Sequence, residues 1–86
     1  MAALIKADGT ISEVVPHNQK TFSLEELQGF VHGYIELVHV PSDRKAVMVV
    51  NEEGLVYDLP LNHAASQLAD QRIVGDALVC LRKEIQ

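Results

Sequence analysis

The chain has 86 residues, 48% of them hydrophobic, and carries twelve acidic and seven basic residues for a formal charge of −5. This length suits a single domain, residues 1–86, with enough Val, Leu and Ile to form one core. The negative charge argues against direct nucleic-acid binding, because a surface that binds a phosphate backbone must be basic.

Cysteine content and hydropathy indicate an intracellular protein. Cys80 is the only cysteine, so an intramolecular disulfide is excluded. It lies in the apolar run 77–81, where a cysteine packs as a small hydrophobic side chain. The apolar stretch before Lys6 is too short for a signal peptide, and no segment approaches the ~20 apolar residues of a membrane span. We therefore expect a cytoplasmic location.

The first third of the chain predicts a hairpin and then a helix. Asp8-Gly9 separates the apolar runs 2–6 and 11–15 and favours a type I′ turn, which needs positive φ at both central residues. Ser23 and Glu26 have the spacing of a capping box at a helix start. Gly33 is expected to end this helix in the left-handed conformation.

The middle of the chain predicts a meander of three strands, residues 34–40, 45–50 and 55–57. The turn 41–44 joins the first two strands, and Asn51–Gly54 joins the last two with Gly54 in the left-handed position. The run 45–50 is apolar at nearly every position, which is typical of a central strand covered on both faces.

The last third predicts a short helix and a final strand. Asn62 is a good N-cap for a helix over 63–69, and the run 77–81 is a strand. Residues 82–86 are expected to fray. The predicted fold is therefore α+β, a small mixed and mainly antiparallel sheet with two short helices in the order β-β-α-β-β-β-α-β.

Five short motifs spread along nearly the whole chain resemble one family. They are Leu27-Gln28, Gly33-Tyr34-Ile35-Glu36, Asn51-Glu52-Glu53-Gly54, Leu59-Pro60-x-Asn62-x-Ala64 and Ile73-Val74-Gly75-Asp76-Ala77. The chain is similar to the small proteins grouped as domain of unknown function 3846, found mainly in phages, plasmids and bacterial mobile elements. It differs at His32, where the family often has a second glycine, and in its alanine-rich first hairpin. The family has no assigned catalytic residues, so the resemblance assigns none here.

The histidines give no sign of a metal centre. His17, His32, His39 and His63 are separated so that no pair has the spacing that places two imidazoles on one face, and there is no cysteine pair. No nucleophile elbow or paired general acid and base is recognisable either. We therefore expect no metal, no cofactor and no catalytic residues.

A binding site is expected where the second helix begins. Its free N–H groups favour a small polar or phosphorylated ligand if the sheet brings other polar groups close. The simpler explanation is that Asn62 only caps the helix and His63 is a surface residue. The candidate ligand-binding residues are Tyr34, Glu36, Asn51, Glu52, Asn62 and His63.

The function expected from these observations is binding without catalysis. The resemblance implies a mobile-element context, in which small proteins block a host defence protein or sequester a nucleotide-like signalling molecule in the host cytoplasm. Open sheet edges in so short a chain lead us to expect a homo-oligomer. Two alternatives stay open. One is an acidic mimic of DNA that inhibits a nucleic-acid-binding protein, and the other is a small-substrate enzyme that uses His39 or His63.

Overall fold

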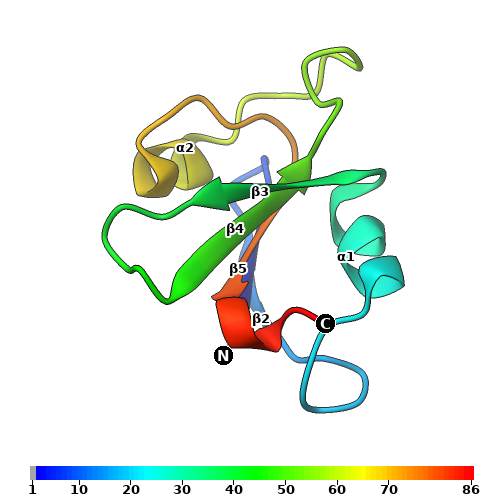
Figure 1. The fold of residues 1–86 in the computed structure, drawn as a ribbon. Helices are drawn as coiled ribbons and strands as arrows, with labels where there is room; N and C mark the ends of the chain where they lie inside the picture. Colours follow the sequence, from blue (N-terminus) through cyan, green and yellow to red (C-terminus); the bar gives the residue numbers. More distant parts are fainter. Residues whose placement is uncertain (1) are drawn as a thin grey trace.

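One antiparallel sheet of five strands, in the order β2-β1-β5-β4-β3, forms the middle of the molecule (Figure 1). The structure is a computed structural model that describes residues 2–86. The strands and helices are β1 (Ala2–Ile5), β2 (Ile11–Val14), α1 (Leu24–Val31), β3 (Ile35–His39), β4 (Ala46–Asn51), α2 (His63–Ala69) and β5 (Ala77–Leu81). The predicted α+β class, with a mainly antiparallel sheet and two short helices, is confirmed.

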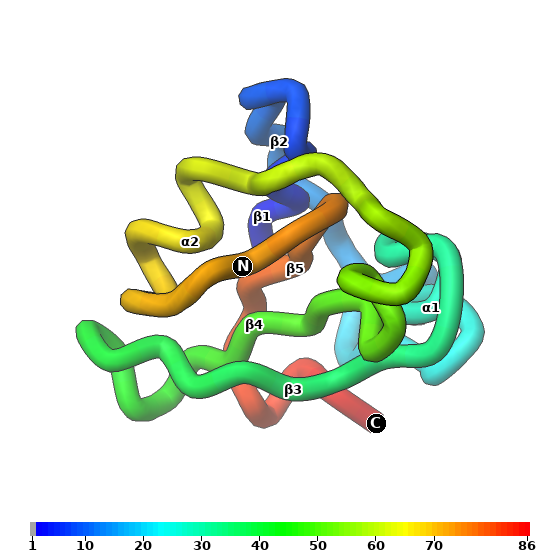
Figure 2. The backbone as a smooth tube through the Cα atoms, turned by 90° about the horizontal axis from the view of Figure 1, so that it is seen from above, coloured from blue at the N-terminus to red at the C-terminus, as the bar shows by residue number. Residues whose placement is uncertain are grey.

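Each face of the sheet carries one helix and one hydrophobic cluster, as Figure 2 shows with α1 and α2 on opposite sides of the strands. The α1 face buries Phe22, Leu27 and Val31 against Val47 and Leu78. The α2 face is built mainly from smaller residues, among them Val38, Val40, Met48, Ala65, Ala69 and Ile73. All six residues of β4 are buried, because this strand is covered from both sides. The prediction of a central strand at this position is confirmed.

The first hairpin forms as predicted, but with a longer connection. The Lys6 N–H donates to the Thr10 carbonyl at 2.8 Å and closes the turn between β1 and β2. Gly9 has φ of 96°, whereas Asp8 has no positive φ. The predicted type I′ turn is therefore wrong, because it requires positive φ at both residues.

The start of α1 agrees with the sequence, and its end does not. Ser23 accepts from the Glu26 N–H while the Glu26 carboxylate accepts from the Ser23 N–H, which is a complete capping box. At the other end His32, with φ of 66°, takes the left-handed conformation that was predicted for Gly33. Gly33 is instead required for close approach, since a Cβ there would lie 2.9 Å from the Asn51 Nδ2.

The predicted third strand of the meander, residues 55–57, does not form. The segment is a series of turns that ends at Asp58, where φ is 54°. Both edges of β4 are already occupied, by β3 on one side and by β5 on the other, so no position remains for a strand that follows it directly. Gly54 is not left-handed either, since its φ is not positive. Glycine is needed there for close packing, because a Cβ would lie 2.7 Å from the Val74 Cγ2.

The C-terminal residues also differ from the expected frayed tail. Arg82–Glu84 form a 3-10 helix, and Ile85 packs against the α1-side cluster. The Phe22 N–H donates to the Glu84 carbonyl at 2.6 Å, and the Gln86 N–H donates to the Phe22 carbonyl at 3.1 Å. This segment therefore closes the side of the molecule next to α1.

Candidate functional site

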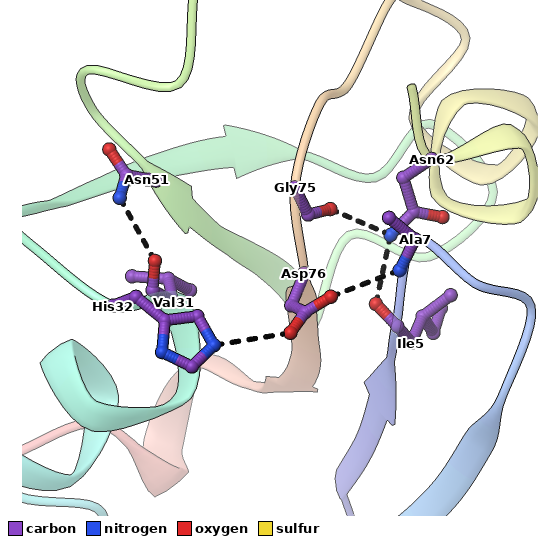
Figure 3. Close-up of polar contacts among 8 residues, drawn as sticks. All are labelled: Ile5, Ala7, Val31, His32, Asn51, Asn62, Gly75 and Asp76. Carbon is purple, nitrogen blue, oxygen red and sulfur yellow. Dashed lines mark hydrogen bonds and ion pairs between the residues drawn. The ribbon is translucent and has the colours of Figure 1, made fainter. Parts of the chain in front are cut away.

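Asn62 makes three hydrogen bonds at the start of α2, and Figure 3 shows the two that its Nδ2 donates. Its Nδ2 donates to the carbonyls of Ile5 at 2.8 Å and Gly75 at 2.9 Å, while its Oδ1 accepts from the Ala65 N–H at 3.0 Å. The side chain is only 1% exposed. The predicted cap is confirmed. The two bonds from Nδ2 also connect α2 to β1 and to the segment before β5.

Asn51 has a comparable role at the end of α1, as Figure 3 shows. Its Nδ2 donates to the Val31 carbonyl at 2.9 Å, which satisfies an acceptor at the end of α1. Its Oδ1 accepts from the Glu53 N–H at 2.7 Å and starts the turn after β4. Nearby, the His32 Nε2 lies 3.3 Å from the Asp76 Oδ2, and the other oxygen of Asp76 accepts from the Ala7 N–H.

A cavity of about 390 Å³ lies beside the ends of β3 and β4 on the α2 face. Glu36 and Glu52 contribute carboxylates to it, and Arg72 contributes the only cation of its described lining. Val38, Val50 and Ile73 form apolar parts of the wall, and Leu55 and Val56 line it from the loop after β4. This mixture suits a polar or protein-borne group better than a phosphate, because two carboxylates repel an anion.

Three of the six predicted ligand-binding residues come together in this cavity, namely Glu36, Asn51 and Glu52. Tyr34 lies close by, because its carbonyl accepts from the Glu52 N–H at 2.9 Å, and its side chain is exposed. Asn62 and His63 are not part of the lining. Asn62 faces the interior with both ends of its amide bonded, and His63 is an exposed residue at the start of α2.

Leu55, Val56 and Tyr57 form the most exposed apolar segment of the described chain. Their exposed fractions are 75%, 77% and 62%. The loop projects beyond the sheet at the top of Figure 1. Sequence reasoning missed it because three consecutive apolar residues after a turn are typical of a strand. The available signal was its shortness, since Gly54 and Pro60 leave room for only a few residues.

Four cations gather at the opposite end of β4 and were also missed. Arg44, Lys45, Arg82 and Lys83 line a second cavity, of about 540 Å³, together with Leu81. The only sequence signal was the repeated dipeptide Arg-Lys, found just before β4 and just after β5. The two dipeptides are far apart in the chain and meet because Ala46 pairs with Leu81 in the sheet.

His39 and His63, which the enzyme alternative would use, lie on opposite sides of the sheet. His39 pairs with Val47 on the α1 face, whereas His63 begins the helix that covers the other face. Among residues 2–86, no group of three or more His, Cys, Asp or Glu side chains is placed to hold a metal ion. Cys80 is buried as predicted, and burial raises the pKa of its thiol to about 11.

The acidic residues that a DNA mimic would use lie on both faces of the sheet. Glu13 and Glu36 lie on the α2 face by their register, and Glu25 and Glu26 belong to α1 on the other face. The Glu26 carboxylate accepts backbone N–H bonds from Ser23 and His17, which lower its pKa. Such an arrangement does not form a single row of phosphate-like charges.

Within residues 2–86, no helix combines the length and the hydropathy that crossing a membrane would need. No curated protein and no solved structure gives a significant match to the chain. One family model, described as domain of unknown function (DUF3846), matches residues 1–85. The match spans β1 through to the C-terminal 3-10 helix, and it contains every motif on which the resemblance rested. The chain therefore belongs to the DUF3846 family.

Proposed function

We propose that this protein acts by binding, without catalysis, and that it holds a partner protein through the loop Leu55–Tyr57 and the cavity beside it. The observation that carries the proposal is the exposure of three consecutive large apolar side chains, each at least 62% accessible. Monomeric proteins rarely expose contiguous apolar surface without a use for it. Tyrosine and large aliphatic side chains are also the groups that supply contact area at interfaces.

The loop is held in shape before any partner arrives. The Leu59 N–H donates to the Gly54 carbonyl at 3.0 Å, and the Asp58 N–H donates to the Leu55 carbonyl at 3.3 Å. These two bonds are those of a Schellman motif, which ends a helical turn with a left-handed residue. At its base Gly54 packs against Val74. An ordered loop loses less conformational entropy on binding than a mobile one, which favours affinity.

Polar groups next to the loop allow the interface to discriminate between partner proteins. Glu36 and Glu52 lie in the cavity that Leu55 and Val56 line, so a partner that inserts a basic side chain there would be favoured. The phage and mobile-element setting implied by the family resemblance leads us to propose a defence protein in the host cytoplasm as the partner. Blocking such a protein needs only tight binding, which fits a chain with no recognisable catalytic set.

The proposal is tested by the triple variant Leu55→Ser, Val56→Ser, Tyr57→Ser. Host proteins captured by the wild type are identified by mass spectrometry, purified and titrated with both forms. We expect the triple variant to lose about 2 kcal/mol or more of binding free energy, because central apolar anchors dominate such interfaces. Its folding should change little, since the three side chains are exposed.

A matched control replaces three other exposed apolar residues, as Ile11→Ser, Val15→Ser, Leu24→Ser. These side chains are 55–68% exposed and lie around β2 and at the start of α1, away from the loop. This control should bind the purified partner as the wild type does. Equal affinity of the loop variant and the wild type for that partner would disprove the proposal.

A further inference from the structure

The second cavity concentrates positive charge on a protein that is negative overall. Four of its seven basic residues, Arg44, Lys45, Arg82 and Lys83, line this one cavity. Among the described residues, its lining contains no carboxylate. Four cations in one place repel one another, so an anionic ligand would stabilise this arrangement.

Backbone contacts fix the two segments that carry these cations. The Arg82 N–H donates to the Lys45 carbonyl at 2.8 Å, and the Arg82 Nε donates to the Arg44 carbonyl at 3.2 Å. The Nε contact orients the guanidinium and leaves its two terminal amino groups available for an oxyanion. Arginine held in this way binds phosphate through two parallel hydrogen bonds.

The acidic side chains of the same two segments are directed to the backbone. The Asp43 carboxylate accepts from the Lys45 N–H at 2.9 Å, and the Glu84 carboxylate accepts from the Leu81 N–H at 2.8 Å. Neither residue lines the cavity. The described lining of the cavity is therefore positive, with no carboxylate between the four cations.

We propose that this cavity binds a small phosphate-bearing molecule of the nucleotide class. Its volume of about 540 Å³ lies in the range of small-molecule sites, and the half-buried Leu81 gives an apolar contact for a base or sugar. A long nucleic acid is disfavoured because it would extend onto a surface with twelve acidic residues and only three other cations. This site lies at the other end of β4 from the loop Leu55–Tyr57 and is independent of the proposed partner interface.

Calorimetric titrations at low salt with ATP, tripolyphosphate and adenosine test the ligand class. We expect ATP and tripolyphosphate to bind and adenosine not to bind, because the phosphates provide most of the attraction. Binding should weaken as salt is added. A result in which ATP does not bind, or in which adenosine binds as well as ATP, would overturn the proposal.

Two double variants with equal loss of charge test the location. Arg44→Gln with Lys83→Gln should weaken ATP binding about tenfold or more, because hydrogen bonds to charged groups are lost. Lys6→Gln with Lys20→Gln removes two cations elsewhere and should change the dissociation constant for ATP by less than about threefold. If both double variants weaken ATP binding equally, the effect is one of overall charge and the cavity is not the binding site.

Two further measurements complete the test. Amide chemical shifts of residues 44–45 and 81–83 should move on adding ATP, and the loop variant Leu55→Ser, Val56→Ser, Tyr57→Ser should still bind it. If a 20-nucleotide single-stranded DNA binds more tightly than ATP through the same four cations, the ligand is nucleic acid and the proposed class is wrong.

Discussion

Asn62 shows how much one buried amide contributes to this fold. Its three hydrogen bonds join the start of α2, the end of β1 and the turn before β5, and these segments are distant in sequence. A cap seen from sequence accounts for only the bond to the Ala65 N–H. The other two bonds satisfy buried carbonyls, and this explains why the residue is not available to a ligand.

Replacing Asn62 by alanine should destabilise the domain by about 3 kcal/mol or more. The variant loses an N-cap and leaves the carbonyls of Ile5 and Gly75 without these donors in a buried place. Urea unfolding followed by circular dichroism measures the effect.

Asn18→Ala is the matched control, because within residues 2–86 its side chain bonds to N–H groups of Lys20 and Thr21 that are exposed. Asn18→Ala should lower the free energy of unfolding by less than about 1 kcal/mol. Similar losses for both variants would contradict the role given to Asn62.

The glycines in and after α1 differ in their packing, and neither of them ends the helix. α1 ends at His32 in a left-handed conformation, although glycine follows it directly. Gly33 is needed for another reason. A Cβ there would lie 2.9 Å from the Asn51 Nδ2, which bonds the last turn of α1. Gly29, inside α1, has nothing within 4 Å of the position that a Cβ would take.

The two glycines should therefore respond in opposite directions to alanine. Gly29→Ala should stabilise the protein by up to about 1 kcal/mol, because alanine is the better helix former. Gly33→Ala should destabilise it by about 1–2 kcal/mol, since Asn51 must move and its bond to the Val31 carbonyl weakens. Thermal and urea unfolding measure both changes. A shift of the same sign in both variants would refute this account of Gly33.

At the scale of the whole molecule, the sheet has two edges, β2 and β3. β3 is the more apolar of the two, and its Leu37 is 51% exposed. An exposed edge strand pairs readily with another chain unless charge or covering prevents it. We propose the β3 edge as the surface through which the protein forms a homo-oligomer.

Light scattering of the purified protein tests this proposal. We expect the wild type to form a dimer or larger assembly, and Leu37→Lys to reduce it to a monomer, because lysine on an edge strand opposes pairing. Ser12→Lys on β2 is the control and should keep the assembly. A wild-type protein that is strictly monomeric at high concentration would rule out the β3 interface.

Local signals in the sequence were sufficient for most elements. The Ser23 and Glu26 capping box, the cap at Asn62, the first hairpin and the apolar run of β4 each depend on neighbours within a few residues, so propensity and periodicity identify them. Residues 55–57 have the same local signal and were assigned wrongly. The position beside β4 that residues 55–57 would need is taken by β5, which lies about thirty residues further along the chain.

Local sequence patterns were enough to predict the class of fold, both helix starts and the buried state of Cys80. Long-range pairing in the sheet places β5 beside β4, which exposes Leu55–Tyr57 and brings two Arg-Lys pairs together at one cavity. Periodicity and capping are set by neighbouring residues, whereas exposure and charge clustering depend on which distant segments the sheet brings together.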